Sequence, residues 1–127
     1  MNRKKKTIPF EFILDALLPL VPVTRPMFGC TAVYVGPKIV LILRERESHP
    51  EDNGVWIATT AEHHASLRKE FPSMRSINVL GSGETNWQML PSASDDFDRS
   101  AARACELILQ HDPRIGKIPK AKKKKRK

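Results

Sequence analysis

An uninterrupted run of five apolar residues, positions 39–43, places the strongest constraint on what this chain can fold into. A short apolar run of this kind is typical of a central strand that is buried on both faces. Gly36 and Pro37 precede the run and predict a short turn, and the β-branched residues 31–35 before that turn predict a neighbouring strand. The chain is therefore expected to build a sheet with a buried centre.

The other segments predict helices before, within and after this sheet. A first helix is expected between Thr7, which can cap it, and Pro19, which ends it. Strands are expected at residues 31–35, 39–43, 55–59, 77–80 and 87–90, and further helices at residues 61–71 and from about residue 92 or 94 to Pro113. In the last two strands the alternation places Asn78 and Gln88 on the solvent side. The order α-β(3)-α-β(2)-α predicts an α+β fold, a two-layer α/β sandwich with an antiparallel sheet.

Charge divides the chain into a body and two tails. The 127 residues suggest a single domain. Residues 1–6 carry four basic groups and residues 113–127 carry nine, without any acid, whereas the middle holds nine basic and fourteen acidic residues, a formal charge of −5. Because such basic blocks cannot bury apolar surface, we expect a basic N-terminal tail (1–6), one domain (7–112) and a disordered basic C-terminal tail (113–127).

The compartment is expected to be the cytoplasm. No apolar run approaches the roughly 18 residues of a membrane span, and no membrane contact is expected. The basic start resembles the first part of a secretory signal, but Pro9, Glu11, Asp15 and Pro19 interrupt the segment that follows. Two cysteines far apart in the sequence are more typical of reduced thiols than of a disulfide framework.

Metal and cofactor sites have no support in the residue spacing. There is no C-x-x-C, H-x-x-H or H-E-x-x-H pattern, so no metal or cofactor is expected. His63 and His64 are neighbours on a predicted helix and are interpreted as a solvent-facing pair. The loop that contains Glu47, His49, Glu51 and Asp52 is interpreted as solvated, because it lacks EF-hand spacing, but binding of a hard cation stays open.

No catalytic group stands out either, and the chain is not expected to be an enzyme. Cys30 lies at a strand entry without a base near it in sequence, and Cys105 lies on the apolar face of a helix. Both are interpreted as structural. Residues 81–84 have the glycines of a turn but not those of a nucleotide-binding loop, and no G-x-S-x-G pattern is present.

One stretch resembles a known family. Residues 27–43, "MFGCTAVYVGPKIVLIL", resemble the opening of the TfoX N-terminal domain, a bacterial family that typically shows Met-Phe-Gly-Gly, then a tyrosine, a glycine-containing turn and an apolar strand. The matching residues are Met27, Phe28, Gly29, Tyr34, Gly36 and Lys38, and Trp87 before "MLP" matches a later segment. Cys30 and Ala32 depart from the pattern. The resemblance covers about residues 9–112, and a stand-alone N-domain, without the separate C-terminal domain of full-length TfoX proteins, is expected.

The resemblance implies a fold similar to type III secretion chaperones and YjbR-like proteins, without catalytic residues. The family takes its name from the regulation of competence genes. Within the pattern, Phe28 is expected to fill the core between helix and sheet, so that Phe28→Ala would cost roughly 3–5 kcal/mol. Gly29 is expected to give the backbone freedom at the strand entry.

Two functions follow as hypotheses. The first is a protein-interaction or regulatory module that binds another protein, or itself, through an edge strand or a helix face. The alternative is a regulator that holds nucleic acid nonspecifically through its lysine-rich tails, and an enzyme with an unrecognised site ranks third. The tail residues concerned are Lys120, Lys122, Lys123, Lys124, Lys125, Arg126 and Lys127. Lysines on a tail contact phosphates and do not read bases.

Overall fold

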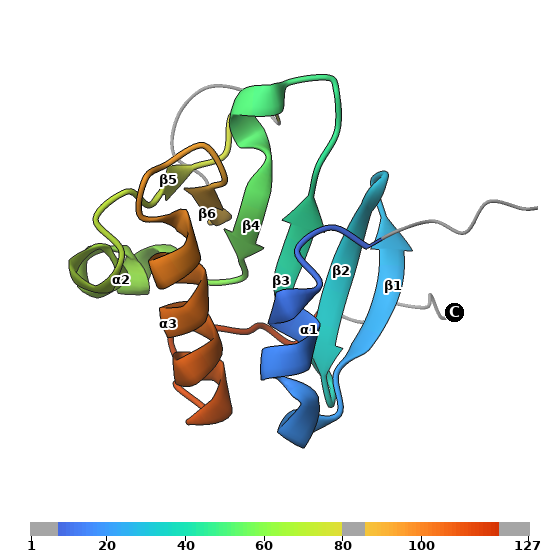
Figure 1. Cartoon of the computed structure of the whole chain (residues 1–127). Coiled ribbons are helices and arrows are strands. Elements are labelled where there is room, and N and C mark those ends of the chain that lie inside the picture. Colours follow the sequence, from blue (N-terminus) through green and yellow to red (C-terminus); the bar gives the residue numbers. More distant parts are fainter. Residues whose placement is uncertain (1–7, 80–85, 120–127) are drawn as a thin grey trace, which may run out of the picture.

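The computed structural model describes residues 8–79 and 86–119, which form a six-stranded antiparallel sheet with helices on one face (Figure 1). The strands are β1 (Val23–Met27), β2 (Cys30–Val35), β3 (Lys38–Arg44), β4 (Gly54–Ile57), β5 (Arg75–Ser76) and β6 (Gln88–Pro91), in the order β1-β2-β3-β4-β6-β5. The α-helices are α1 (Phe12–Ala16), α2 (His64–Glu70) and α3 (Phe97–Leu109), and the 3₁₀ turns are η1 (Leu18–Leu20), η2 (Pro50–Asp52) and η3 (Ala61–His63). The predicted α+β class with an antiparallel sheet is confirmed.

Strand β1 was not expected, so four strands rather than three separate α1 from α2. Its sequence, VTRPM, has neither a run of apolar residues nor clean alternation, and Pro22 and Pro26 argue against a strand. A proline is tolerated at a sheet edge, where no neighbour requires its missing N–H. β1 is such an edge and pairs only with β2.

The main core lies between the helices and the sheet. Ile13 and Leu17 of the first helical segment contribute fully buried side chains, and β3 contributes Leu41 and Leu43. From α3, the apolar face on which Cys105 was expected is buried, and its members are Phe97, Ala101, Ala104, Cys105 and Ile108. A second, smaller cluster on the opposite face includes Ala32, Ile42, Trp56 and Met89.

Two side chains expected in solvent are buried. His64 is 5% exposed, and its Nε2 atom lies 3.4 Å from the backbone oxygen of Asn86, so His63 and His64 are not a solvent-facing pair. Gln88 is fully buried, and its amide donates to the Ser76 hydroxyl at 2.7 Å. In both cases a hydrogen-bond partner allows the polar side chain to be buried. The pattern of polar and apolar residues along the sequence does not indicate such partners.

Residues 112–117, here called the C-terminal segment, belong to the fold, so the expected boundary between domain and tail at residue 113 is wrong. Ile115 is 3% exposed in the main core. Lys117 and Ile39 exchange two backbone hydrogen bonds of 2.9 Å each, and the Gly116 amide donates to the Ala58 carbonyl at 2.7 Å. The segment thus pairs with β3 beyond the end of β4.

An ion-pair cluster attaches the same segment to the helical layer. Arg114 lies 2.8 Å from Asp112 and 3.1 Å from Glu70 of α2, and Glu70 also pairs with Arg103 of α3 at 3.0 Å. The hydrogen bonds from Arg103 and Arg114 hold the pKa of Glu70 below its usual range. Basic residues alone, which predicted a tail, therefore do not mark where the fold ends.

Other element boundaries shift by a few residues. α1 begins at Phe12 and α3 at Phe97, both later than predicted, and β5 lies just before the expected strand at residues 77–80. The proposed cap Thr7 and the turn glycines within residues 81–84 lie outside the described ranges. Within those ranges, no helix combines the length and apolarity that crossing a bilayer requires.

Candidate interaction site at the β1–β2 hairpin

The turn between β1 and β2 has an unusual backbone. Met27 pairs with Cys30, so only Phe28 and Gly29 form the loop. Their φ angles are +55° and +75°, the combination of a type I′ hairpin turn. Glycine adopts this conformation freely, but a bulky residue does not, and a residue held there costs on the order of 1–3 kcal/mol.

Phe28 is exposed, which corrects the expectation that it fills the core. Its side chain keeps 78% of its accessible surface, the largest fraction among the exposed large apolar residues of the described ranges. The apolar residues on either side in sequence suggested burial, but the turn directs this side chain away from both layers. An exposed aromatic side chain on a tight turn is a candidate contact for a partner.

We therefore predict that Phe28→Ala changes the free energy of unfolding by less than about 1 kcal/mol, because little buried surface is lost. Denaturant unfolding of both proteins measures the difference. A loss of roughly 3–5 kcal/mol would instead indicate that Phe28 is buried in solution.

Side chains from the loop after β3 and from the first residue of β2 contact the tip of the hairpin. The Arg46 guanidinium donates to the Phe28 carbonyl at 3.1 Å, and the Cys30 thiol lies 3.6 Å from the same oxygen. Gly29 makes room for this contact, since a Cβ atom there would lie 1.5 Å from Arg46 Nη1. The turn is thus fixed in place although its most prominent side chain is in solvent.

Two arginines near the hairpin are exposed and have no carboxylate partner within the described ranges. They are Arg25, whose guanidinium lies 5.2 Å from the ring centre of Tyr34, and Arg46. Arg44, by contrast, is buried and donates to the carbonyls of Ser48 and His49. Aromatic and arginine side chains are the types most enriched at the centres of protein interfaces.

The other residues of the TfoX-like pattern are not gathered around Phe28. Met27 and Tyr34 are partly buried. They pack against the second, smaller cluster, on the face of the sheet that no described helix covers. Gly36 lies in the β2–β3 turn with φ of +60°. The other residues of the pattern therefore form turns or pack against the sheet, and Phe28 is the residue of the pattern that is exposed for contact with a partner.

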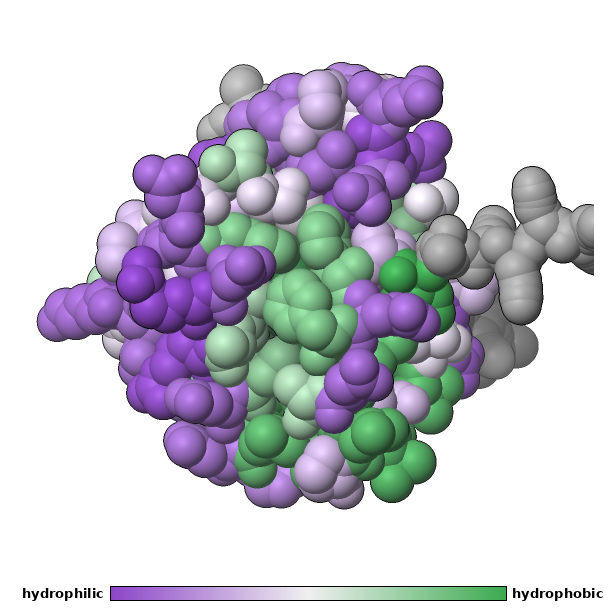
Figure 2. Space-filling model, viewed as in Figure 1, coloured by the Kyte–Doolittle hydropathy of each residue, from purple (hydrophilic) through white to green (hydrophobic). Residues whose placement is uncertain are grey.

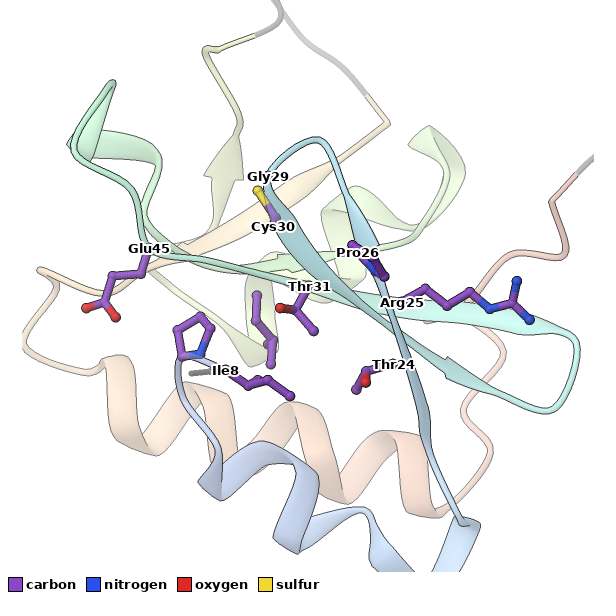
Figure 3. A pocket seen from close by; sticks show the side chains of 10 residues that line it. Ile8, Thr24, Arg25, Pro26, Gly29, Cys30, Thr31 and Glu45 are labelled. Carbon is purple, nitrogen blue, oxygen red and sulfur yellow. The ribbon is translucent and has the colours of Figure 1, made fainter. Parts of the chain in front are cut away.

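A cleft of about 450 Å³ opens beside the hairpin, under the segment that leads into α1 (Figure 3). Its apolar walls include Ile8, Pro9, Pro26 and Leu43, and its polar groups include Thr31 and Glu45. In Figure 3, Arg25 extends away from the cleft, whereas Glu45 lies at one end of it. The cleft is therefore mostly apolar, with a carboxylate at its rim.

The outer edge of β1 is poorly suited to binding another strand. In a two-residue hairpin the residues that flank the loop form a hydrogen-bonded pair, and such pairs alternate along the ladder. The register pairs Arg25 with Ala32, so Thr24 and Pro26 turn their backbone groups outward. Pro26 has no N–H, which leaves Thr24 as the outward donor of β1. Proline at this position protects an edge strand from pairing.

A second exposed apolar surface lies at the other end of β1. Figure 2 shows it as green surface over α1 and the turn after it, with hydrophilic surface above and to its left. Its exposed members are Phe12, Leu18, Val21 and Val23. Val21 also has a positive φ of 53°, so it resembles Phe28 in both exposure and backbone conformation.

The loop considered for a hard cation is organised by protein groups instead. Asp52 is fully buried, and its carboxylate accepts hydrogen bonds from the amides of Asn78 and Val79, both at 2.7 Å, and from Arg75 at 3.2 Å. The Asp52 carboxylate is therefore engaged by protein donors, whereas Glu47 and His49 are exposed. Across residues 8–79 and 86–119, no group of three or more His, Cys, Asp or Glu side chains could hold a metal ion.

Both cysteines are free and buried, as a structural role predicts. Burial raises the pKa of the Cys30 thiol, although the positive charges of Arg44 and Arg46 act in the opposite direction. Burial also raises the pKa of Cys105, to about 11. Raised pKa values leave few thiolates near neutral pH, so neither residue has the setting of a nucleophile.

We predict that Cys30 reacts with a disulfide reagent more slowly than a free model thiol at neutral pH, and that the rate rises with pH as the thiolate forms. The variant Cys105→Ala isolates the Cys30 signal. Faster reaction than the model thiol would indicate an activated cysteine and would contradict the structural role.

The lysine-rich residues 120–127 lie outside the described ranges, so their proposed role has no structural description. Comparison with protein-family models finds no match for this chain. Searches of curated proteins and of solved structures find no similar protein. The candidate site therefore stands on its own geometry.

Proposed function

We propose that this chain is a protein-interaction module that contacts its partner with the tip of the β1–β2 hairpin, with Phe28 as the central contact residue. The observation that carries the proposal is the combination of 78% exposure with a φ of +55° at an aromatic residue. A chain that needed only a turn here would have a better residue for it, because Asn-Gly is strongly preferred in type I′ turns.

The retained phenylalanine therefore lowers stability without contributing to the core. Strained residues persist where the surroundings hold them, and they cluster at binding and catalytic positions. Here the hydrogen bond from Arg46 to the Phe28 carbonyl supplies that support. A fixed aromatic side chain loses little conformational freedom on binding, which favours it as an anchor.

The sharpest test compares Phe28→Asn with Val21→Asn. Both changes remove an exposed apolar side chain at a positive φ, at opposite ends of β1. Asparagine tolerates this backbone region, so both variants are expected to be as stable as the native protein or more stable, by up to about 1 kcal/mol. We expect Phe28→Asn, and not Val21→Asn, to remove specific partners from affinity captures made with lysate of the producing cells.

Two results would contradict the proposal. One is a set of captured proteins that is the same for the native chain and for Phe28→Asn. The other is loss of partners with Val21→Asn alone, which would place the interaction on the apolar surface around α1 instead. Circular dichroism and unfolding of each variant ensure that a lost partner does not reflect a lost fold.

We further propose that the module acts by binding rather than by catalysis, and that it works in the cytoplasm as a TfoX N-domain-like regulator. Support for the first part comes from the candidate site, whose cysteine has a raised pKa and whose carboxylate, Glu45, is exposed to solvent. Support for the family rests on residues 27–43 and on Trp87 before the "MLP" of residues 89–91. The identity of the protein whose capture depends on Phe28 would show which process this module regulates.

The second candidate function is nonspecific nucleic-acid binding by residues 120–127, which carry seven basic residues and no acid. Flexible lysines bind phosphates, with Kd on the order of 10⁻⁴–10⁻⁶ M at physiological salt and a steep decrease in affinity as salt rises. Fluorescence anisotropy with duplex and single-stranded DNA would compare the full chain with a chain that ends at Pro119. Equal binding by both, or sequence-selective binding, would contradict this mechanism.

A further inference from the structure

The exposed aromatic residue and the cleft are adjacent on the surface. Phe28 forms the tip of the hairpin, and Gly29, the next residue, already lines the cleft. The cleft walls nearest to the hairpin are apolar, with Pro26 from β1 and Ile8 from the segment opposite it (Figure 3). An apolar anchor and an apolar receptor of suitable size, at about 450 Å³, therefore share one end of the molecule.

Each of these two features carries an unpaired charge, and the cleft is also lined by Arg25, whose side chain extends away from it (Figure 3). Arg46 is held beside Phe28 by its hydrogen bond to the Phe28 carbonyl, and it contacts no carboxylate within the described ranges. Glu45 is exposed at the rim of the cleft, and it contacts no cation within the same ranges. The anchor is thus accompanied by a positive charge and the receptor by a negative one.

We propose that the partner that occupies this cleft is a second copy of the chain, in a two-fold symmetric dimer. Phe28 of each copy enters the cleft of the other, and Arg46 of each copy lies near Glu45 of the other. A two-fold contact requires a self-complementary surface, in which an anchor and its receptor lie side by side on the same molecule. This inference rests on the proposed function, since it names the partner of the same hairpin tip.

The geometry of the edge strand favours this mode over sheet extension. Because Pro26 removes one of the two outward N–H groups of β1, a regular ladder between the β1 strands of two copies is disfavoured. Side-chain insertion and charge pairing remain as the source of affinity. An interface of two aromatic anchors and two ion pairs is small, so we expect a weak dimer in exchange with monomer.

Sedimentation velocity of the full chain, from about 1 µM to about 1 mM, is the direct measurement. We expect a concentration-dependent dimer for the native chain and for the control Val21→Asn. Phe28→Asn is expected to raise the dissociation constant of the dimer by at least about tenfold. A buried aromatic anchor contributes about 1.4 kcal/mol or more to the free energy of binding, and this amount corresponds to a factor of ten. Low-concentration circular dichroism verifies that each monomer is folded.

A mixing experiment tests the charge pairing. Glu45→Arg places like charges at both contacts of its own dimer, and so does Arg46→Glu, so each variant alone is expected to be monomeric at concentrations where the native chain dimerises. In an equimolar mixture, a dimer of one variant with the other restores both opposite-charge contacts. We therefore expect the mixture to form a heterodimer, and high salt to weaken it.

Several outcomes would overturn the inference. They are a native chain that stays monomeric throughout, a dimer that Phe28→Asn leaves intact, and a mixture that stays monomeric while the native chain dimerises. A monomeric native chain with Phe28-dependent capture of a different protein would refute the dimer alone and leave the proposed interaction module standing. A monomeric chain without such capture would refute both.

Discussion

Ending the chain after His111 is expected to destabilise the domain by about 4 kcal/mol or more, whereas ending it after Pro119 should leave the free energy of unfolding unchanged. The longer truncation removes Ile115, whose loss from a core costs roughly 2–5 kcal/mol. It also removes three backbone hydrogen bonds to Ile39 and Ala58, each contributing about 1 kcal/mol. Denaturant unfolding of the two truncations and the full chain gives the comparison.

The ion pairs of the C-terminal segment add to this effect. Removal of Arg114 deprives Glu70 of one of its two guanidinium partners, and removal of Asp112 eliminates the pair that Arg114 makes within the segment. The chain that ends at Pro119 retains all of these contacts and is the matched control. Equal stability of both truncations would show that residues 112–117 do not contribute to the fold in solution.

The second large effect is expected at Asp52, for which Asp52→Ala should cost about 3 kcal/mol. The buried carboxylate accepts from two backbone amides and from Arg75. Its removal leaves both amides without this acceptor and Arg75 without its carboxylate, although Arg75 still donates to the backbone carbonyls of Ser76 and Glu51. Glu51→Ala is the matched control one residue earlier. The side chain of Glu51 is exposed, and only its backbone carbonyl accepts from Arg75, so we expect a change within about 0.5 kcal/mol.

Thermal and denaturant unfolding of both variants measure this difference. Equal stability of Asp52→Ala and the native chain would mean that water replaces the carboxylate without cost, and that the residues following Arg75 are held by other contacts. A large loss in Glu51→Ala would indicate that the loop as a whole, and not the Asp52 carboxylate, carries the stability.

The central strands and the last helix could be predicted because the spacing of their apolar residues indicates which positions are buried. Residues 39–43 are buried on both faces, and the stripe along α3 repeats with the helical period. Strand β1 could not be predicted in this way, because an edge strand does not need alternation and tolerates Pro26. With β1 missed, the residues after it read as an irregular strand entry instead of a two-residue hairpin loop.

The candidate site was missed for the same reason. Once a strand is placed before Phe28, the pair Phe28-Gly29 stands between two strands, and a glycine in a two-residue loop is a strong hairpin signal. Phe28 is exposed because it lies in that turn, and the apolar character of phenylalanine alone would have predicted burial. Asp52 and Ile115 were missed because their partners, near Val79 and in the main core, are distant in sequence.

The pairing of Ile39 with Lys117 joins positions 78 residues apart, and it has a kinetic consequence. The backbone partners of the C-terminal segment are Ile39 and Ala58, which come together only after β3 and β4 have paired. The segment should therefore dock late, after the rate-limiting step of folding. Contacts that form after the transition state slow unfolding and hardly affect folding. A few residues near the end of the described chain would then set how long each molecule stays native once folded.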